Sequence, residues 1–504
     1  MKDFSISHKQ QTAIFVLIIL IFISFAVASS LTYRPEVDEG MFASPAMNLA
    51  AEGYMGTTVL DTSGTNLTRI EQRTYWVMPL FLVNAAAFFK VFGASLFAMW
   101  LVSTFWGIIL LISFYFITLK LSKNKNTALL SMGLVACSYM VIATASLARM
   151  DIMSASLGFA GIAVYLSFRE KDFSKAIFFS QTLVMLSGLT HSNGIMAFVG
   201  LAFLTLYYDF RRIKIKHIFL AAIPYIIGGI GFGIWVLQDY QAFKDQFIDN
   251  AKMGGRLAGF TAPLEGFIKE FTERYPHAVG LGATTGGHSG PIYLKSLILI
   301  GYIVGVLGLI FTKELRQNLN YFALLILVGI YFAGLTILDG QKETYYLIHI
   351  IPLYVACFAI WLNWAWNNYS NSLMRLGLIG GVFIFIMLQI GGIGLRIKQN
   401  TYGRLYKPTI AYLKENSTEK DLIMGKSDLG FELGFPKNFI DDGEFAYSSG
   451  KRPKFIIYDS QVESSWQDSK VSFPEFYVYF PKLLKEEYKV AYENEGYKVY
   501  VRNQ

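Results

Sequence analysis

Residues 12–40 read T-A-I-F-V-L-I-I-L-I-F-I-S-F-A-V-A-S-S-L-T-Y-R-P-E-V-D-E-G, and this stretch decides the class of fold. Its apolar part, Thr12 to Leu31, matches the roughly 20 residues that a membrane-spanning helix needs. Two adjacent carboxylates, Asp38 and Glu39, follow a few residues later. Ionisable groups at a membrane boundary are costly, which makes this pair a functional-site hypothesis. The alternative interpretation is a solvated acidic loop.

The composition extends this interpretation to the whole chain. Hydrophobic residues make up 54% and charged residues 16% of the 504 residues, whereas soluble domains carry about 25% charged residues. The net charge of +8 does not indicate nucleic-acid binding, because lysines and arginines cluster in short loops between apolar runs. Cys137 and Cys357 lie within apolar runs, so we expect buried thiols without a disulfide. The sequence A-V-A at 26–28 could be a signal-peptidase site, but the long preceding apolar run favours an uncleaved first span.

Eleven apolar segments are predicted to cross the membrane, near 12–33, 97–119, 128–147, 152–168, 176–190, 194–208, 218–238, 293–312, 321–338, 345–366 and 376–395. A twelfth apolar segment, 76–93, is predicted to dip into the membrane and return, because a crossing there would place the basic loops on alternating sides. On this topology the large loops 34–96 and 239–292 face outward. The glycine-rich run 280–291 within the second loop is either a lid over a site or a plain connector.

The chain after residue 398 has a different character. About 30% of its residues are charged, above the roughly 25% of soluble domains. The pattern predicts helices at 406–416 and 481–488, the second with proline at a favourable first position, and strands at 422–425, 454–459 and 497–502. We therefore expect a membrane domain, 1–398, and a small outward-facing α/β domain, 399–504. A short helix within 43–53, ended by Gly53, is expected in the first loop.

Polar side chains of five motifs fall on the outer side of this topology. They are Asp38 with Glu39, Arg73 with Tyr75, Arg149 with Asp151, His191, and Lys342 with Glu343. Each has a structural alternative: Arg149 and Asp151 could form a local ion pair at helix ends, His191 could be a hydrogen-bonding core residue, and Lys342 could only reach toward the interface. Carboxylates together with several cations beside an apolar region suit the binding of a lipid-linked phosphate.

The same motifs carry a family resemblance. D-E-G-M-F-A and N-L-A-A-E-G in the first loop, Y-W-V-M-P-L-F, S-L-A-R-M-D-I-M, G-L-T-H-S-N-G-I-M and K-E-T-Y-Y-L-I-H-I-I-P-L-Y occur in the order found in the GT-C class of integral-membrane glycosyltransferases. The chain most resembles the branch with protein O-mannosyltransferases and the lipid A aminoarabinose transferase. It departs from that pattern at W-V-M-P-L, with one proline in place of two, and at T-H-S-N-G in place of Thr-Lys-Gly. These departures leave the donor sugar open.

The resemblance implies transfer of a hexose or pentose from polyprenyl phosphate to a glycan, lipid or protein acceptor, with inversion at the anomeric carbon. It implies Asp38 as general base, and Glu39 and Asp151 as groups that orient the acceptor or hold a divalent ion such as Mg or Mn. Arg73, Arg149 and Lys342 would neutralise the phosphate, and Tyr75 and His191 would orient the acceptor or a metal. The metal itself is unknown. Separately, the lysine- and isoleucine-rich composition predicts a bacterial inner membrane, and the loop charges place the active site and the C-terminal domain outside the cytoplasm.

Two other classes of function compete with this interpretation. A transporter or flippase of lipid-linked sugars could also have about twelve apolar segments. However, transporters commonly show internal repeats and broken helices at the midplane, and this sequence shows no evident repeat. A non-catalytic membrane scaffold would leave the ordered polar motifs unexplained.

Overall fold

The computed structural model describes residues 7–253, 255–256, 258–279 and 291–503, so most of the glycine-rich run 280–291 lies outside the described residues. Contacts within the chain divide it into two compact units. We call them the helical unit (residues 1–29, 103–238 and 251–395) and the sheet unit (residues 30–102, 239–250 and 396–504). The sheet unit thus combines most of the first predicted outer loop with the C-terminal part. The predicted domain boundary at 398/399 stays a prediction.

The helical unit consists mainly of long apolar helices, some of which begin or end in the sheet unit. They are α1 (His8–Thr32), α4 (Leu96–Ser122), α5 (Lys125–Ala136), α6 (Tyr139–Ala145), α7 (Met150–Phe168), α8 (Phe173–Thr190), α9 (Ile195–Asp209), α10 (Ile215–Leu237), α16 (Leu297–Phe311), α17 (Lys313–Arg316), α18 (Leu319–Leu338), α19 (Ile351–Asn368) and α20 (Ser372–Gln399). Short helices α12 (Asn250–Met253), α13 (Ala258–Thr261), α14 (Pro263–Lys269), η4 (Glu270–Arg274) and α15 (Tyr275–Ala278) lie between α10 and α16, and η1 (Ser192–Gly194) and η6 (Thr344–His349) precede α9 and α19.

Each of the eleven predicted spans coincides with one of these helices or with the pair α5–α6. Among the described residues, eight helices are long and apolar enough to cross a membrane, and α5 with α6, bent by 61°, would be a ninth span. The polytopic helical fold is therefore confirmed. The predicted spans at α8 and α19 do not pass the same test, so the number of crossings stays a prediction.

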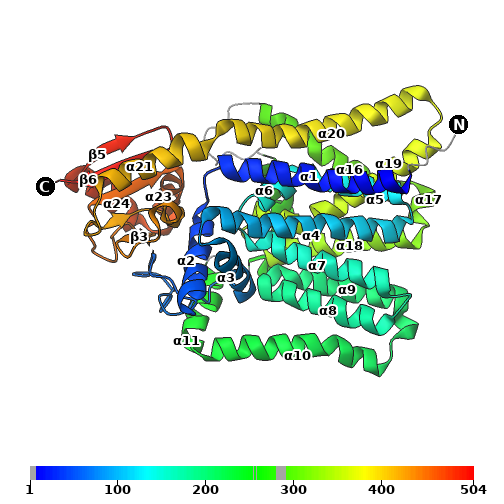
Figure 1. The fold of residues 1–504 in the computed structure, drawn as a ribbon, viewed down its shortest axis with the longest axis horizontal. Helices are drawn as coiled ribbons and strands as arrows, with labels where there is room; N and C mark the ends of the chain where they lie inside the picture. The colour runs from blue at the N-terminus through cyan, green and yellow to red at the C-terminus, as the bar shows by residue number, and fades with distance from the viewer. Residues whose placement is uncertain (1–6, 254, 257, 280–290, 504) are drawn as a thin grey trace. The chain divides into compact units, whose positions relative to one another are not determined.

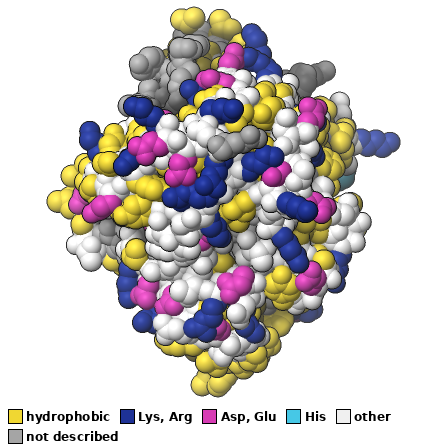
Figure 2. All heavy atoms as spheres, turned by 90° about the vertical axis from the view of Figure 1, so that its left-hand side faces the viewer, with side chains coloured by type: hydrophobic (Ala, Val, Ile, Leu, Met, Phe, Trp, Pro, Cys, Tyr) yellow, Lys and Arg dark blue, Asp and Glu magenta, His cyan; other side chains and the backbone are white. Residues whose placement is uncertain are grey.

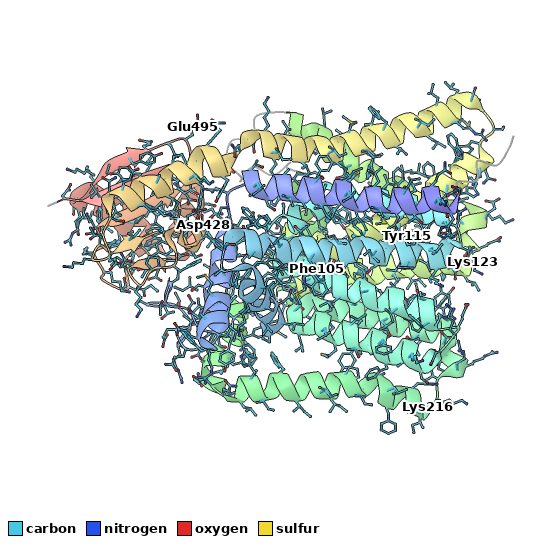
Figure 3. The ribbon with its side chains drawn as sticks, viewed as in Figure 1. Phe105, Tyr115, Lys123, Lys216, Asp428 and Glu495 are labelled. Atoms are coloured by element: carbon cyan, nitrogen blue, oxygen red, sulfur yellow. The ribbon has the colours of Figure 1, made fainter. Side chains whose placement is uncertain are left out.

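Helices α7, α8 and α9 lie side by side in the helical unit (Figure 1). They approach closely because small residues meet: a side chain added at Gly158 would overlap Ala197. Lys123 and Lys216, from two basic loops of this unit, lie at the same end of it (Figure 3). This placement agrees with the prediction that both loops face the same side of the membrane.

The first outer loop forms two helices, α2 (Val37–Glu52) and α3 (Pro79–Phe92), in the sheet unit. The predicted end of α2 is confirmed, because Gly53 adopts a left-handed φ of 80° that glycine favours. The helix begins earlier than expected, at Val37, and so contains Asp38 and Glu39. Helix α3 has 14 residues and is about 21 Å long, shorter than the roughly 30 Å hydrocarbon core. A dip of this segment into the membrane stays a prediction.

A six-stranded sheet forms the C-terminal core, in the order β1-β3-β2-β4-β6-β5. Its strands are β1 (Leu60–Asp61), β2 (Ile423–Met424), β3 (Phe439–Asp442), β4 (Phe455–Asp459), β5 (Tyr488–Glu493) and β6 (Tyr497–Arg502), and the adjacent helices are η7 (Tyr402–Tyr406), α21 (Lys407–Asn416), η8 (Ser427–Leu429), α22 (Gly430–Leu433), α23 (Ser460–Ser472) and α24 (Pro474–Glu487). Strands β1, β3, β2 and β4 are parallel, β6 pairs antiparallel with β4, and β5 pairs antiparallel with β6. The first loop therefore contributes a strand, β1, to the C-terminal sheet.

Alternating side chains of the strands enter two separate apolar cores. Ile423 packs in the core with α21, and its neighbour Met424 packs in the core with α23 and α24. The predicted small α/β domain is confirmed as a fold. The face in Figure 2, which includes part of the sheet unit, mixes basic and acidic side chains, as is usual for surfaces in contact with water.

The predicted start of the last helix is wrong. Helix α24 begins at Pro474, and Pro481 lies inside it rather than at its first position. Phe476, Phe480 and Leu483 are spaced i, i+4 and i+7 and are all buried, so they form one apolar stripe along the helix. Burial of this stripe outweighs the backbone hydrogen bond that is lost at Pro481.

Candidate active site

The first turn of α2 separates the two adjacent carboxylates. Glu39 is completely buried; its Oε2 accepts a hydrogen bond from the backbone N–H of Glu36 at 2.7 Å, and its Oε1 accepts one from Nε1 of Trp100 at 3.0 Å. Asp38 is only half-buried, because successive side chains on a helix point about 100° apart. Its place in the first turn also suits a negative charge, since the helix N-terminus carries a partial positive charge. Asp38 is therefore the more accessible carboxylate, and Glu39 holds the turn together.

Arg73 and Tyr75 belong to a loop that is clamped by Gln246. The buried side-chain amide of Gln246 donates to the backbone carbonyls of Thr68 (2.7 Å) and Arg73 (3.0 Å) and accepts from the backbone N–H of Tyr75 (2.6 Å). The guanidinium-bearing Arg73 is half-buried, whereas Tyr75 is fully buried against Phe243. Tyr75 is therefore a packing residue in this structure.

Four of the predicted site residues, Asp38, Glu39, Arg73 and Tyr75, belong to the sheet unit. The other four, Arg149, Asp151, His191 and Lys342, belong to the helical unit. The structure therefore divides them equally between the two units.

In the helical unit, Arg149 and Asp151 form a buried ion pair at the start of α7. Nε of Arg149 lies 2.9 Å from Oδ2 of Asp151, and the guanidinium lies 4.1 Å from the ring centroid of Tyr345. Arg149 precedes α7 and Asp151 is in its first turn. The structure therefore contains the local ion pair at a helix end that was one of the two predicted alternatives. Oδ1 of Asp151 is buried and has no hydrogen-bond partner among the described residues.

His191 lies beside this pair, between α8 and η1. Its Nδ1 accepts a hydrogen bond from the backbone N–H of Asn193 at 3.1 Å, and its ring is 5.0 Å from that of Tyr346. Burial lowers the pKa of His191 to about 4, although the nearby carboxylate of Asp151 opposes this shift. His191 is therefore neutral at pH 7, as a hydrogen-bonding group or a ligand would be.

Three buried polar atoms of this region lack partners within the described part of the chain. They are Oδ1 of Asp151, Nδ2 of Asn193 and Nε2 of His349. Buried polar groups are normally hydrogen-bonded, so three such atoms from α7, η1 and η6 suit a site that receives water or a polar ligand. The charge of Arg256 also acts on His191. We refer to Arg149, Asp151, His191 and His349 as the α7 polar cluster.

Lys342 lies in a separate, charge-balanced network. Its Nζ is 2.9 Å from Oε1 of Glu270 and donates to the carbonyl of Thr336 at 2.9 Å. Arg274 completes the network, with its guanidinium 3.4 Å from Glu270 and 2.6 Å from Asp339. The four charged side chains, two acids and two bases, are each at most 2% exposed. The ammonium of Lys342 is thus neutralised by protein groups.

Sequence reasoning missed the residues that complete these clusters. Glu270 and Arg274 lie in the loop 239–292, whose helices were not predicted. Asp339 belongs to no local motif, and its importance is visible only from its contact with Arg274 in the folded chain. His349 did offer a signal, since an ionisable residue within the apolar run L-I-H-I-I-P is itself a functional hypothesis. Arg256 was indistinguishable from other loop cations.

The described residues offer no group of three or more His, Cys, Asp or Glu side chains arranged to hold a metal ion. The described residues therefore supply no set of three such ligands for a divalent cation, and Mg or Mn at the site stays a prediction.

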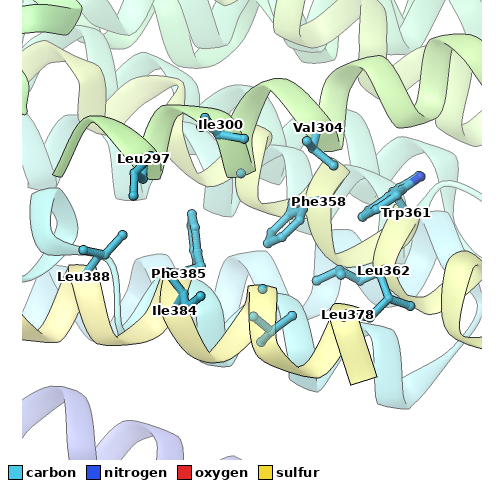
Figure 4. A pocket seen from close by; sticks show the side chains of 14 residues that line it. Leu297, Ile300, Val304, Phe358, Trp361, Leu362, Leu378, Ile384, Phe385 and Leu388 are labelled. Atoms are coloured by element: carbon cyan, nitrogen blue, oxygen red, sulfur yellow. The ribbon is translucent and has the colours of Figure 1, made fainter. Parts of the chain in front are cut away.

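The aromatic segment after Tyr75 serves mainly as packing. Trp76 stacks on Phe42 with ring centroids 5.5 Å apart, and Phe81 and Phe89 are buried. An apolar groove of about 300 Å³ lies in the helical unit, between α16, α19 and α20 (Figure 4). All fourteen lining residues are apolar, among them Leu297, Phe358 and Phe385. Such a groove suits a hydrocarbon chain and cannot hold a charged headgroup.

Comparisons with known proteins agree with the fold described above. No protein-family model matches the chain. An uncharacterized protein of Aquifex aeolicus (strain VF5) is 23% identical over 217 residues, which span 42% of this chain and 40% of that relative. The crystal structure of ArnT from Cupriavidus metallidurans bound to undecaprenyl phosphate is similar with a TM-score of 0.62, at 14% identity, over 98% of both chains.

Structures of a second kind of enzyme are also similar. The Archaeoglobus fulgidus oligosaccharyltransferase in the apo form has a TM-score of 0.60 at 11% identity, over 99% of this chain and 75% of that one. The archaeal oligosaccharyltransferase AglB from Archaeoglobus fulgidus, in complex with an inhibitory peptide and a dolichol-phosphate, has a TM-score of 0.57 at 11% identity, over 98% of this chain and 74% of that one. The fold expected from the GT-C resemblance is therefore confirmed.

Proposed function

We propose that this protein is a glycosyltransferase that moves a hexose or pentose from a polyprenyl-phosphate donor to an acceptor at the outer face of the membrane. The observation that carries the proposal is the likeness, over 98% of both chains, to a structure bound to undecaprenyl phosphate. A second similar structure is an oligosaccharyltransferase in complex with a dolichol-phosphate. Both ligands are phosphates on long isoprenoid chains, which is the donor class that the sequence motifs imply.

The reaction in this proposal is a single displacement with inversion. The oxygen of an acceptor hydroxyl attacks the anomeric carbon of the sugar, the bond from that carbon to the phosphate oxygen breaks, and polyprenyl phosphate leaves. The hydroxyl proton passes to Asp38, which acts as general base. Such positioned proton transfer contributes typically about 10²–10⁴-fold to the rate. The half-buried position of Asp38 supports this role, whereas both oxygens of Glu39 already accept hydrogen bonds from the protein.

Cationic residues stabilise the phosphate as its negative charge develops. We assign this role to Arg149 in the α7 polar cluster and to Arg73 in the sheet unit. For Lys342 we propose a different role, because Glu270 neutralises it at 2.9 Å. It holds the segment that leads into η6, from which Tyr345 packs on Arg149. Asp151 then orients Arg149, and His191 donates or accepts hydrogen bonds as a neutral group.

A transfer assay with vesicles tests this proposal against the flippase alternative. Purified protein would be reconstituted with a mixed pool of polyprenyl-phosphate sugars and an acceptor extract, and free polyprenyl phosphate would be measured by mass spectrometry. A glycosyltransferase releases polyprenyl phosphate in proportion to the sugar transferred. Movement of intact donor across the bilayer without any release would instead support the flippase.

A further inference from the structure

Two contacts tie the residues around Asp38 to the C-terminal sheet within the sheet unit. The first precedes α2: NH1 of Arg34 lies 2.9 Å from Oδ2 of Asp459, and NH2 of Arg34 donates to Oγ of Ser460 at 3.2 Å. The two charged side chains are 15% and 4% exposed. Asp459 ends β4, and its Oδ1 caps α23, so Arg34 is bound to a rigid part of the sheet.

The second contact lies within the first turn of α2. Oγ of Ser427 donates to the backbone carbonyl of Val37 at 2.8 Å, and the N–H of Ser427 donates to Oδ2 of Asp441 in β3 at 2.8 Å. Gly40 lies so close to η8 that a Cβ there would overlap the carbonyl of Ser427. Only a residue without a side chain allows this approach of α2 to the sheet.

We propose that Arg34 and Gly40 are positioning residues for the transfer reaction, and that through them the C-terminal sheet holds Asp38 in place. This inference rests on the proposed function, in which Asp38 is the general base. Arg34 and Gly40 bracket Asp38 in sequence, four residues before it and two after it. We call the contacts of Arg34 with Asp459, and of Val37 and Gly40 with Ser427, the α2 anchor.

The chemistry of the α2 anchor favours positioning over simple stabilisation. A buried ion pair such as Arg34–Asp459 is weak evidence for stability, since desolvation can exceed the Coulombic gain. The ion pair does fix the orientation of the Arg34 side chain, because its planar guanidinium donates hydrogen bonds to both Asp459 and Ser460. A displacement of about 1 Å at a reacting group can slow a reaction about 10²-fold. Even a small shift of α2 after loss of the α2 anchor would therefore lower the rate at which Asp38 takes the proton.

The steric part of the anchor is tested with Gly40→Ala and its matched control Gly443→Ala. An added Cβ at Gly443 meets nothing within 4 Å. In Gly40→Ala we expect kcat to fall about 10- to 100-fold, with an unchanged KM for the polyprenyl-phosphate donor. Hydrogen–deuterium exchange of the amides at 37–45 is expected to accelerate, while the amides of β4 keep their protection. Gly443→Ala is expected to match wild type in all three measurements.

The ionic part of the anchor is tested with a double-mutant cycle of Arg34→Gln and Asp459→Asn. The double variant is expected to lose no more kcat than Arg34→Gln alone, because both changes remove the same contact. Arg34→Lys keeps the charge and is expected to recover part of kcat. If Gly40→Ala does not fold, Ser427→Ala tests the contact of α2 with η8 in its place, because it removes the hydrogen bond to Val37 and leaves the close approach at Gly40 intact. We expect a smaller loss of kcat.

Two results would overturn the positioning role. One is unchanged exchange of the α2 amides in Gly40→Ala and Arg34→Gln; the other is faster exchange with wild-type kcat. Failure of the proposed function looks different: Asp38→Asn would then keep full activity, or no donor would be consumed by wild type. In that case the exchange measurement still shows whether the anchor holds α2, and the role assigned to Asp38 is what fails.

Discussion

Asp38 and Glu39 are neighbours in the chain, yet their carboxylates have different surroundings. Glu39 accepts hydrogen bonds from Trp100 and from the start of α2, while Asp38 is half-buried. The sequence pattern predicted that the pair matters. It could not tell the two apart, because the donor on Trp100 comes from 61 residues away.

Glu39→Gln should therefore damage stability more than chemistry. Its amide can accept only one of the two hydrogen bonds, and its NH₂ group would face a donor. We expect a loss of about 1–3 kcal/mol, seen as a lower Tm in detergent. The kcat per folded molecule should fall much less than in Asp38→Asn. A normal Tm with a kcat as low as that of Asp38→Asn would instead assign the chemistry to Glu39.

Asp428 supplies a pH-dependent term in the sheet unit. It is buried, and its Oδ1 has no hydrogen-bond partner among the described residues. Burial, with the nearby charge of Asp459, raises the pKa of Asp428 well above its usual 3.8, although Arg34 opposes the shift. Between these two pKa values the folded protein holds a proton that the unfolded chain releases. The stability from this group is therefore present at low pH and is lost as pH rises through the folded pKa.

Asp428→Asn should remove this term. We expect the variant to match wild type in Tm near pH 4 and to exceed it at pH 8, because the amide needs no proton to stay neutral. Thermal unfolding of both proteins across this range gives the difference, in which the other titrating groups cancel. A variant that parallels wild type at every pH would show that Asp428 does not titrate in this way.

At the scale of elements, local signals predicted helices and strands well but not all their limits. Gly53 ended α2 as expected, and strands β4 and β6 coincide with the predicted ranges within a residue. The start of α24 was wrong because a buried stripe extends it through Pro481. Strand β1, with two residues, was beyond prediction, since its pairing with β3 exists only in the folded sheet.

The network around Lys342 links elements that are far apart in sequence, η4 and the end of α18. Lys342→Met would leave Glu270 buried with Arg274 as its remaining ionic partner. Removing one member of a buried pair costs about 3–5 kcal/mol, so we expect a clear drop in Tm. Lys216→Met, at an exposed lysine, is the control and should leave Tm unchanged. A normal Tm with a raised KM for the donor would show instead that Lys342 binds phosphate.

At the scale of the whole molecule, the order of short motifs predicted the fold, and eleven apolar segments all became helices or a bent pair. The orientation in the membrane is predicted from loop charges alone. Single cysteines at Lys123, Lys216 and Glu495 test it with a membrane-impermeant maleimide applied to intact cells. We expect labelling at position 495 only, with the unsubstituted protein as background for Cys137 and Cys357. Labelling at position 123 or 216 would show that the orientation in the membrane is opposite to the predicted one.

The clusters that form the candidate site were only partly predictable. Arg149 and Asp151 are two residues apart, so their ion pair could be foreseen from local sequence. Tertiary packing decides which side chains meet Lys342, and it also brings His349 close to the other members of the α7 polar cluster. No local sequence pattern encodes either contact. The same holds for the α2 anchor, which joins residues about 390 and 425 positions apart.

A single-turnover comparison of wild type with Asp38→Asn tests whether Asp38 is the general base of the transfer. Both purified proteins would be loaded with the donor identified in the transfer assay, and release of polyprenyl phosphate would be followed after acceptor is added. We predict that Asp38→Asn binds donor with wild-type affinity, keeps its Tm, and releases polyprenyl phosphate about 10²–10⁴-fold more slowly. Release at the wild-type rate by the folded variant would contradict the account.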